Sequence, residues 1–169
     1  MRDERDFDSA LFDLMKLRFL WIGKTKSSAI KELVAEYLGR LRKFARVEVT
    51  ELRGRKDAGN DLRKLIEKEG EAILSRIEPD PFVVVLDERG RELDSSQMAG
   101  LIEKHGIAGT RQITFVIGGH AGVSSGVKKR ADLLLALSRM TLTHEFARAL
   151  LTEQVYRAYT IMHDLPYQK

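Results

Sequence analysis

The sequence predicts an α/β protein: a three-layer sandwich in which a mostly parallel sheet lies between helices. Two observations carry this prediction. Strand-like and helix-like segments alternate from residue 16 onward, as in proteins built from strand–helix–strand units. Two strand-like segments, 82–86 and 112–117, have the apolar character of strands covered by helices on both faces. Residues 15–169 show no internal repeat and no break in composition, so we expect them to form one domain.

The predicted strands end at turn residues or where the hydrophobic period changes. The segment 46–52 alternates apolar and polar side chains and is typical of a half-buried strand, whereas the others are more apolar. The predicted strands are residues 17–22, 46–52, 82–86, 112–117 and 133–137. We expect a turn over residues 87–91, because this segment is charged and contains a glycine.

The predicted helices begin after Ser, Asp or Thr residues that can cap the first turn. The first has apolar residues at helical spacing, and Pro79 and Pro81 stop the second. The predicted helices run from Ser27 or Ser28 to about Phe44, from about Asp61 to Ile77, from Asp94 or Ser95 to His105, from Ser124 or Ser125 for about one turn, and from Thr143 to about Met162.

Composition excludes several classes of protein. The chain has no cysteine, which excludes a disulfide scaffold, a thiol nucleophile and a Cys-ligated metal. Its four histidines are too scattered to predict a metal site. No apolar run approaches the roughly 20 residues of a membrane helix, and acids stand where a signal peptide carries a basic end. We therefore expect a cytoplasmic protein that binds neither a membrane nor a metal.

Charge is unevenly distributed along the chain. Residues 1–14 hold two arginines against five acids and are predicted to be a flexible extension, although the whole chain carries +4. The strongest basic cluster lies between Arg40 and Lys56. A basic face favours a polyanion, because neutralising phosphates releases counterions. An ordinary solvated surface explains the same cluster equally well.

In parallel α/β sheets, ligands bind beyond the carboxyl ends of the strands. The segments that follow Leu86, Ile117 and Leu137 are therefore the candidate binding loops. The second of them, Gly118–Gly122, is glycine-rich but matches neither a Walker loop nor a dinucleotide fingerprint. A tight turn without a ligand explains these glycines as well.

The start of the last helix and the C-terminus contain unusual residues. His144 follows the capping Thr143, where a histidine is more often an ordinary surface residue than a base. The apolar Leu165-Pro166-Tyr167 near the C-terminus is difficult to explain unless it docks against another surface.

Several motifs occur together, in one order, over about residues 15–169. With these motifs the sequence resembles the ribosomal large-subunit RNA methyltransferase H family, small bacterial members of the SPOUT methyltransferase class. The motifs are Lys16–Lys24 (KLRFLWIGK), Leu65–Glu71 (LIEKEGE), Phe115–Gly122 (FVIGGHAG), Leu137–His144 (LSRMTLTH), Glu153–Tyr159 (EQVYRAY) and Pro166-Tyr167.

The resemblance implies a fold, a cofactor and a reaction. The C-terminal part would form a deep trefoil knot, a rare exception to the rule that chains do not thread loops. S-adenosylmethionine would bind in the knot, and the protein would be a homodimer with the site at its interface. The implied reaction is methylation at N3 of a pseudouridine in 23S rRNA, within the assembled ribosome.

The resemblance also implies roles for particular residues. His144 is the candidate proton acceptor, or the residue that orients the target base. Tyr167 is a second catalytic candidate; with Arg157 and the C-terminal tail it would come from the partner subunit. The implied cofactor-binding residues are Leu86, Gly118, Gly119, Leu137, Ser138, Arg139, Met140, Thr141 and Leu142. The expected RNA-binding residues are Arg53, Arg55, Lys56, Arg139 and Arg157.

The sequence departs from the family pattern at two places. Family members often carry Pro-Glu where this chain has His120-Ala121, and often end Pro-Tyr-His where it has Tyr167-Gln168. The first change excludes a carboxylate role in that loop, and the second excludes a terminal histidine as the base. Two alternatives therefore stay open. One is a noncatalytic ribosome-binding or assembly factor with the same fold, and the other is a SPOUT methyltransferase that acts on another RNA, such as tRNA.

Overall fold

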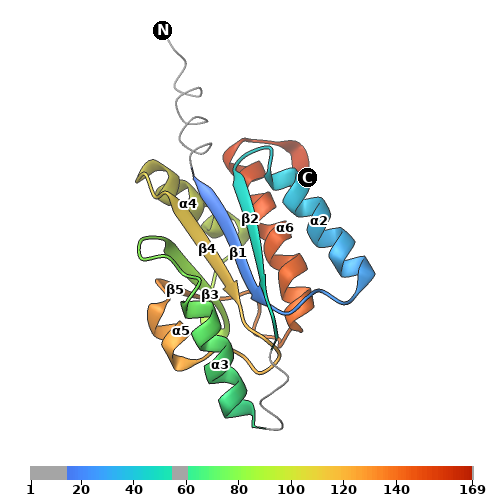
Figure 1. Cartoon of the computed structure of the whole chain (residues 1–169). Helices are drawn as coiled ribbons and strands as arrows, with labels where there is room; N and C mark the ends of the chain where they lie inside the picture. The colour runs from blue at the N-terminus through green and yellow to red at the C-terminus, as the bar shows by residue number, and fades with distance from the viewer. Residues whose placement is uncertain (1–14, 55–60, 169) are drawn as a thin grey trace.

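The computed structural model describes residues 15–54 and 61–168, and in these residues five strands form one parallel sheet (Figure 1). The strand order is β2-β1-β4-β3-β5, and every neighbouring pair is parallel. The strands are β1 (Lys16–Ile22), β2 (Arg46–Leu52), β3 (Phe82–Glu92), β4 (Gln112–Ile117) and β5 (Leu133–Ala136). The predicted α/β class with a parallel sheet is confirmed.

Helices cover both faces of this sheet, which gives the expected three layers (Figure 1). Helix α6 packs between α2 and α4 on one face, and α3 contacts α5 on the other. The helices are α2 (Ser28–Leu41), α3 (Leu62–Leu74), α4 (Ser95–Ile107), α5 (Ser125–Arg130), α6 (His144–Met162) and a final 3₁₀ turn η1 (Pro166–Gln168). No helix in this described part of the chain is long and apolar enough to cross a membrane.

Alternation along β1 explains why the sheet needs two helical layers. Phe19 and Trp21 point into the core shared with α2, α4 and α6, whereas Leu20 and Ile22 point into the core on the α3 and α5 side. All four side chains are buried. The ring of Phe19 stacks on that of Phe115 in the neighbouring strand, with centroids 5.4 Å apart. Apolar side chains on both faces of the central strands thus stabilise both layers.

The predicted helix starts are confirmed at their capping residues. Ser27, Asp94, Ser124 and Thr143 each accept a hydrogen bond from the backbone N–H three residues further on. The predicted C-terminal ends of the first two helices are too long. Helix α2, for example, gives way to tighter i→i−3 bonds at its end, from Lys43 N to Arg40 O and from Phe44 N to Leu41 O.

The predicted turn at residues 87–91 is wrong, because β3 continues through it to Glu92. Leu86 and Arg91 both pair with Leu135, so residues 87–90 form a bulge inside one strand. Gly90 is required there, because a Cβ atom would lie 2.6 Å from the backbone of Leu134. The charged residues that indicated a turn therefore lie in a bulge of β3, between two segments that pair with β5.

The residues expected to form the N-terminal extension, 1–14, lie outside the described residues. Strand order and pairing do not by themselves establish a knotted path, so the trefoil knot stays a prediction.

Candidate functional site

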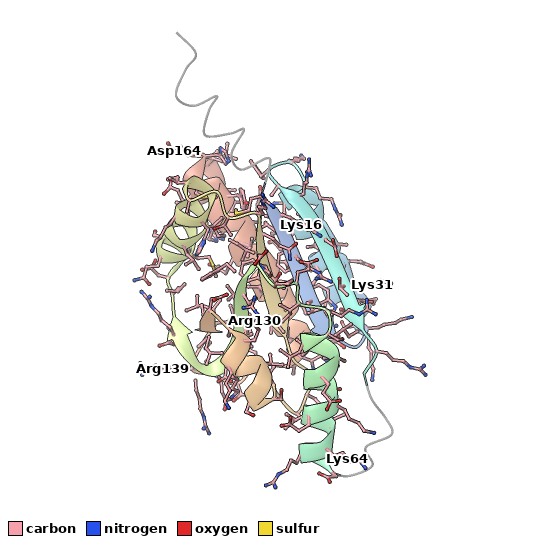
Figure 2. The ribbon with its side chains drawn as sticks, turned by 60° about the vertical axis from the view of Figure 1, so that its left-hand side comes forward. Lys16, Lys31, Lys64, Arg130, Arg139 and Asp164 are labelled. Carbon is pink, nitrogen blue, oxygen red and sulfur yellow. The ribbon has the colours of Figure 1, made fainter. Side chains whose placement is uncertain are left out.

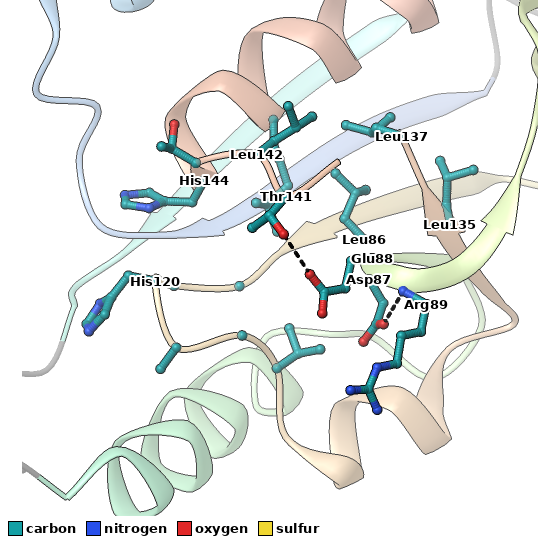
Figure 3. Close-up of a pocket in the computed structure, with 18 of the residues that line it drawn as sticks. Leu86, Asp87, Glu88, Arg89, His120, Leu135, Leu137, Thr141, Leu142 and His144 are labelled. Atoms are coloured by element: carbon teal, nitrogen blue, oxygen red, sulfur yellow. Dashed lines mark hydrogen bonds between the residues drawn. The ribbon is translucent and has the colours of Figure 1, made fainter. Parts of the chain in front are cut away.

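A cavity of about 910 Å³ opens at the carboxyl ends of β4 and β5, beside the bulge of β3 (Figure 3). Its volume lies in the range of about 300–1,000 Å³ that is usual for small-molecule sites. The three segments predicted as binding loops, those after Leu86, Ile117 and Leu137, all contribute to its wall. The cavity therefore lies where a parallel α/β sheet binds its ligand.

Eight of the nine predicted cofactor-binding residues line this cavity. They are Leu86, Gly118, Gly119, Leu137, Ser138, Met140, Thr141 and Leu142. The ninth, Arg139, does not line the cavity: its side chain is 89% exposed, and its Nε donates to Glu92 Oε2 at 2.9 Å. Arg139 lies at the periphery of the molecule (Figure 2). The wall thus combines apolar side chains, hydroxyl groups and glycine backbone.

The glycines of the loop after β4 are required by contacts within the chain itself. A Cβ on Gly118 would lie 2.6 Å from the side chain of Val123. A Cβ on Gly119 would lie 2.5 Å from Oε2 of Glu69, a carboxylate on α3 that is only 4% exposed. Tight packing behind the loop therefore explains these two glycines, and it leaves their backbone on the cavity wall. Sequence reasoning missed Glu69, since nothing in the α3 pattern marks it as buried.

Two acids of the β3 bulge also line the cavity, and sequence reasoning assigned them to a turn. Asp87 accepts from the backbone N–H of Arg89 at 2.9 Å and pairs with Lys128 of α5 at 2.5 Å. Burial raises the pKa of Asp87, but these two partners outweigh it and hold the pKa below its usual value. Glu88 accepts from the Thr141 hydroxyl at 3.3 Å, across the cavity wall (Figure 3). Their position directly after a buried strand is the signal that could have found them.

His144 is the first residue of α6 and lies at the edge of the cavity, facing the loop that carries His120 (Figure 3). Its side chain is half-buried. Burial lowers the pKa of His144, and the positive charge of Arg148 lowers it further. The imidazole is therefore neutral near pH 7 and can accept a proton.

Arg157 lies in the C-terminal half of α6, and Tyr167 lies in η1 and contacts that half of the helix. The Tyr167 hydroxyl donates to Glu153 Oε1 at 3.0 Å and lies 3.1 Å from the hydroxyl of Tyr37. The Arg157 guanidinium lies over the Tyr167 ring at 4.7 Å and also bonds Glu153. Glu153 is nine residues beyond His144, about 14 Å at ~1.5 Å per residue. One chain therefore does not bring Tyr167 and His144 together.

The basic loop after β2 is only partly described. Arg53 is exposed at the end of that strand, whereas Arg55 and Lys56 lie outside the described residues. The structure shows no group of three or more potential metal ligands within residues 15–54 and 61–168.

The fold and the cavity together indicate the class of protein to which the chain belongs. A parallel α/β sheet with a cavity at its carboxyl end, lined by a glycine loop, four leucines and His144, is typical of proteins that bind a small organic molecule. The chain belongs to the SPOUT methyltransferase family, because the family model described as "Predicted SPOUT methyltransferase" matches residues 15–168.

Curated relatives of the chain carry a more specific name. It is 45% identical over 153 residues to "Ribosomal RNA large subunit methyltransferase H" of Trichlorobacter lovleyi, covering 90% of this chain and 99% of that protein. The protein of the same name from Streptococcus gordonii is 40% identical over 159 residues, covering 92% and 100%. A solved methylase family protein from Neisseria gonorrhoeae superposes with a TM-score of 0.49 at 13% identity, over 85% of this chain and 82% of that one. That likeness is too weak to bear on function.

Proposed function

We propose that the protein transfers the methyl group of S-adenosylmethionine to N3 of a pseudouridine in the large-subunit rRNA of assembled ribosomes. The observation that carries this proposal is the cavity at the carboxyl ends of β4 and β5, beside the bulge of β3, with His144 at its edge. The name shared by relatives at 40–45% identity supports rRNA as the substrate. A ribosomal substrate would place the protein in the cytoplasm.

The residues of the cavity suit this methyl donor. Leu86, Leu137 and Leu142 provide an apolar surface for a flat ring, and the backbone at Gly118 and Gly119 offers hydrogen-bonding groups without side chains. The Glu88 carboxylate suits a ligand that bears hydroxyl groups or positive charge. When bound, S-adenosylmethionine supplies an electrophilic methyl group, so the protein chiefly has to align the acceptor with it.

We assign to His144 the role of accepting the proton of the target base or of orienting that base. The N3 proton of the target base has to be lost for methylation, and a neutral imidazole at the edge of the cavity can accept it or orient the base. Neither His120-Ala121 nor Gln168 supplies a carboxylate or a terminal histidine that competes for this role.

We further propose that the active form is a homodimer. If Tyr167 and Arg157 act on the RNA at this site, a second copy has to supply them, because in one chain they lie in or against the C-terminal half of α6. Exposed apolar side chains beside the cavity suit such an interface: Met140 is 74% exposed and Phe146 is 60% exposed.

The proposal is tested in two steps. Calorimetric titration with S-adenosylmethionine, run with light scattering, should give binding by a dimer. Labelled S-adenosylmethionine should then methylate ribosomes that lack the modification. Methylation of free tRNA but not of ribosomes would overturn the substrate. A dimer that binds ribosomes but neither binds nor consumes the donor would instead be the noncatalytic assembly factor.

A further inference from the structure

Arg148, one turn after His144 on α6, is fully buried at 0% exposure. Its guanidinium donates to the carbonyl oxygen of Ile22 at 2.5 Å and to the hydroxyl of Thr25 at 2.9 Å. It also lies 5.1 Å from the centroid of the Trp21 ring. Its Nε is buried and has no hydrogen-bond partner within the described residues.

Glu145, directly after His144, makes a second connection to the same segment. Its two carboxylate oxygens accept from the backbone N–H groups of Lys26 and Ser27, at 3.0 and 3.1 Å. Because Ser27 is the N-cap of α2, this carboxylate also stabilises the start of that helix. The first two turns of α6 therefore hold residues 22–27, at the end of β1 and in the loop that follows it, through Glu145 and Arg148.

This arrangement costs stability, which argues that it serves more than packing. Among the described residues, Glu145 and Glu51 act on this buried guanidinium without a close ion pair, and one of its N–H groups is unsatisfied. Such a group is destabilising relative to an apolar side chain of similar size. A structural anchor for the β1 loop does not need a charge. The charge of Arg148 also acts on neighbouring groups, and His144 and Glu145 are the titratable residues within one helical turn before it.

We propose that Arg148 and Glu145 are the positioning residues of His144: they fix the start of α6 to the β1 loop and place one buried cation and one anion beside the imidazole. This inference rests on the proposed function, in which His144 handles the substrate proton. Neither residue lines the cavity, so both act through His144 and not on the substrate.

The charged and titratable groups that act on His144 lie on three elements around it. Arg148 and Glu145 lie on α6, His120 on the loop after β4, and Lys26 on the loop after β1. Burial, Arg148, His120 and Lys26 lower the pKa of His144, whereas Glu145 raises it. Arg148 and Glu145 thus act in opposite directions on the same group, although both hold the same loop.

Opposite signs give a test that a purely structural role would fail. Arg148→Met removes the charge and keeps the length of the side chain, whereas Glu145→Gln removes the opposite charge and keeps one acceptor oxygen. The His144 imidazole is titrated by NMR in full-length protein, with His144→Gln to assign its signal. We expect the midpoint to move up in Arg148→Met and down in Glu145→Gln. The ratio of kcat at pH 8 to kcat at pH 6 should follow, rising at least about threefold in the first variant and falling in the second.

Each outcome is decisive. Midpoints that move in the same direction, or that do not move in folded variants, overturn the inference; circular dichroism and donor titration establish folding. If Arg148→Met does not fold, the downward shift in Glu145→Gln decides alone. Midpoints that move as expected, without a change in the rate profile, support the positioning device and overturn His144 as the proton acceptor. The inference and the proposed function therefore fail separately.

Discussion

The two halves of α6 differ in how completely their polar side chains are hydrogen-bonded. From the middle of the helix onward, the Glu153 carboxylate is bonded by Arg157, Tyr167 and Gln154, and the Tyr167 hydroxyl also lies within hydrogen-bond distance of Tyr37. At its N-terminal end, the His144 imidazole has no hydrogen bond to any described residue, and one N–H of the buried Arg148 has none either.

The difference teaches where to look for chemistry. A closed set of hydrogen bonds fixes the structure, because each buried polar group has its partner. Titratable groups left without such partners beside a cavity, with a lowered pKa, are typical of functional sites. On this comparison the N-terminal end of α6 serves the reaction, and within one chain the C-terminal end holds the tail in place.

The largest effect is expected from His144→Ala. If His144 accepts the proton, kcat should fall by about 100-fold or more, whereas S-adenosylmethionine binding should be nearly unchanged. Single-turnover methylation of ribosomes measures the rate, and calorimetry measures the binding of S-adenosylmethionine. His163→Ala is the matched control, because His163 lies at the other end of α6 and stacks on Phe44 with centroids 5.2 Å apart. Equal losses in both variants would contradict the comparison.

The pH profile tests the same contrast without a mutation. The neutral imidazole of His144 is the active form, and its pKa lies below the usual value of about 6.5. The rate of methylation should therefore be level near pH 7 and fall tenfold per pH unit below the lowered pKa. Burial and the bonds to Tyr37 and Glu153 raise the pKa of Tyr167, so its hydroxyl stays protonated and should add no alkaline limb. A limb between pH 8 and 9 that disappears in Tyr167→Phe would contradict this assignment.

Tyr167→Phe should act on stability. The substitution removes the hydroxyl bonds to Glu153 and Tyr37 but keeps the ring against Tyr156, whose centroid lies 4.9 Å away. We expect the free energy of unfolding to fall by about 1–2 kcal/mol, measured by urea denaturation. The slope of kcat against pH should not change, and a changed slope would mean that the hydroxyl takes part in proton transfer.

Local signals in the sequence were enough for most of the fold. Caps such as Asp94 and Thr143 and the alternation along β2 predicted helix starts and a strand, because these signals act within a few residues. The bulge in β3 was not predictable, since it depends on how Leu86 and Arg91 both pair with Leu135, more than 40 residues away. Residues 87–91 read locally as a turn, and only the tertiary ladder makes them a strand.

Some features of the candidate site could likewise be predicted from local sequence signals, and others could not. The carboxyl ends of the predicted strands indicated which segments line the cavity, and eight of the nine cofactor candidates implied by the family resemblance lie on its wall. The burial of Glu69 and Arg148 was not predictable, because a charge in an amphipathic helix is more often solvated, and the layer that covers it comes from distant segments. Arg139 shows the reverse: its position in the loop suggested a contact with the cofactor, whereas its side chain points to solvent.

Arg139→Ala should therefore give the smallest effect and complete the comparison. A side chain 89% exposed, bonded only to Glu92 among the described residues, is free to reach an RNA phosphate but contributes little to the cavity. We expect S-adenosylmethionine affinity to be unchanged, and the slope of log affinity for ribosomes against log salt to fall by about 1. The matched control is Arg111→Ala, an exposed arginine just before β4, at the opposite end of the sheet, which should leave the slope as it is. If S-adenosylmethionine bound more weakly to Arg139→Ala but not to Arg111→Ala, Arg139 would instead be a cofactor-binding residue, because loss of a phosphate contact leaves the cavity wall intact.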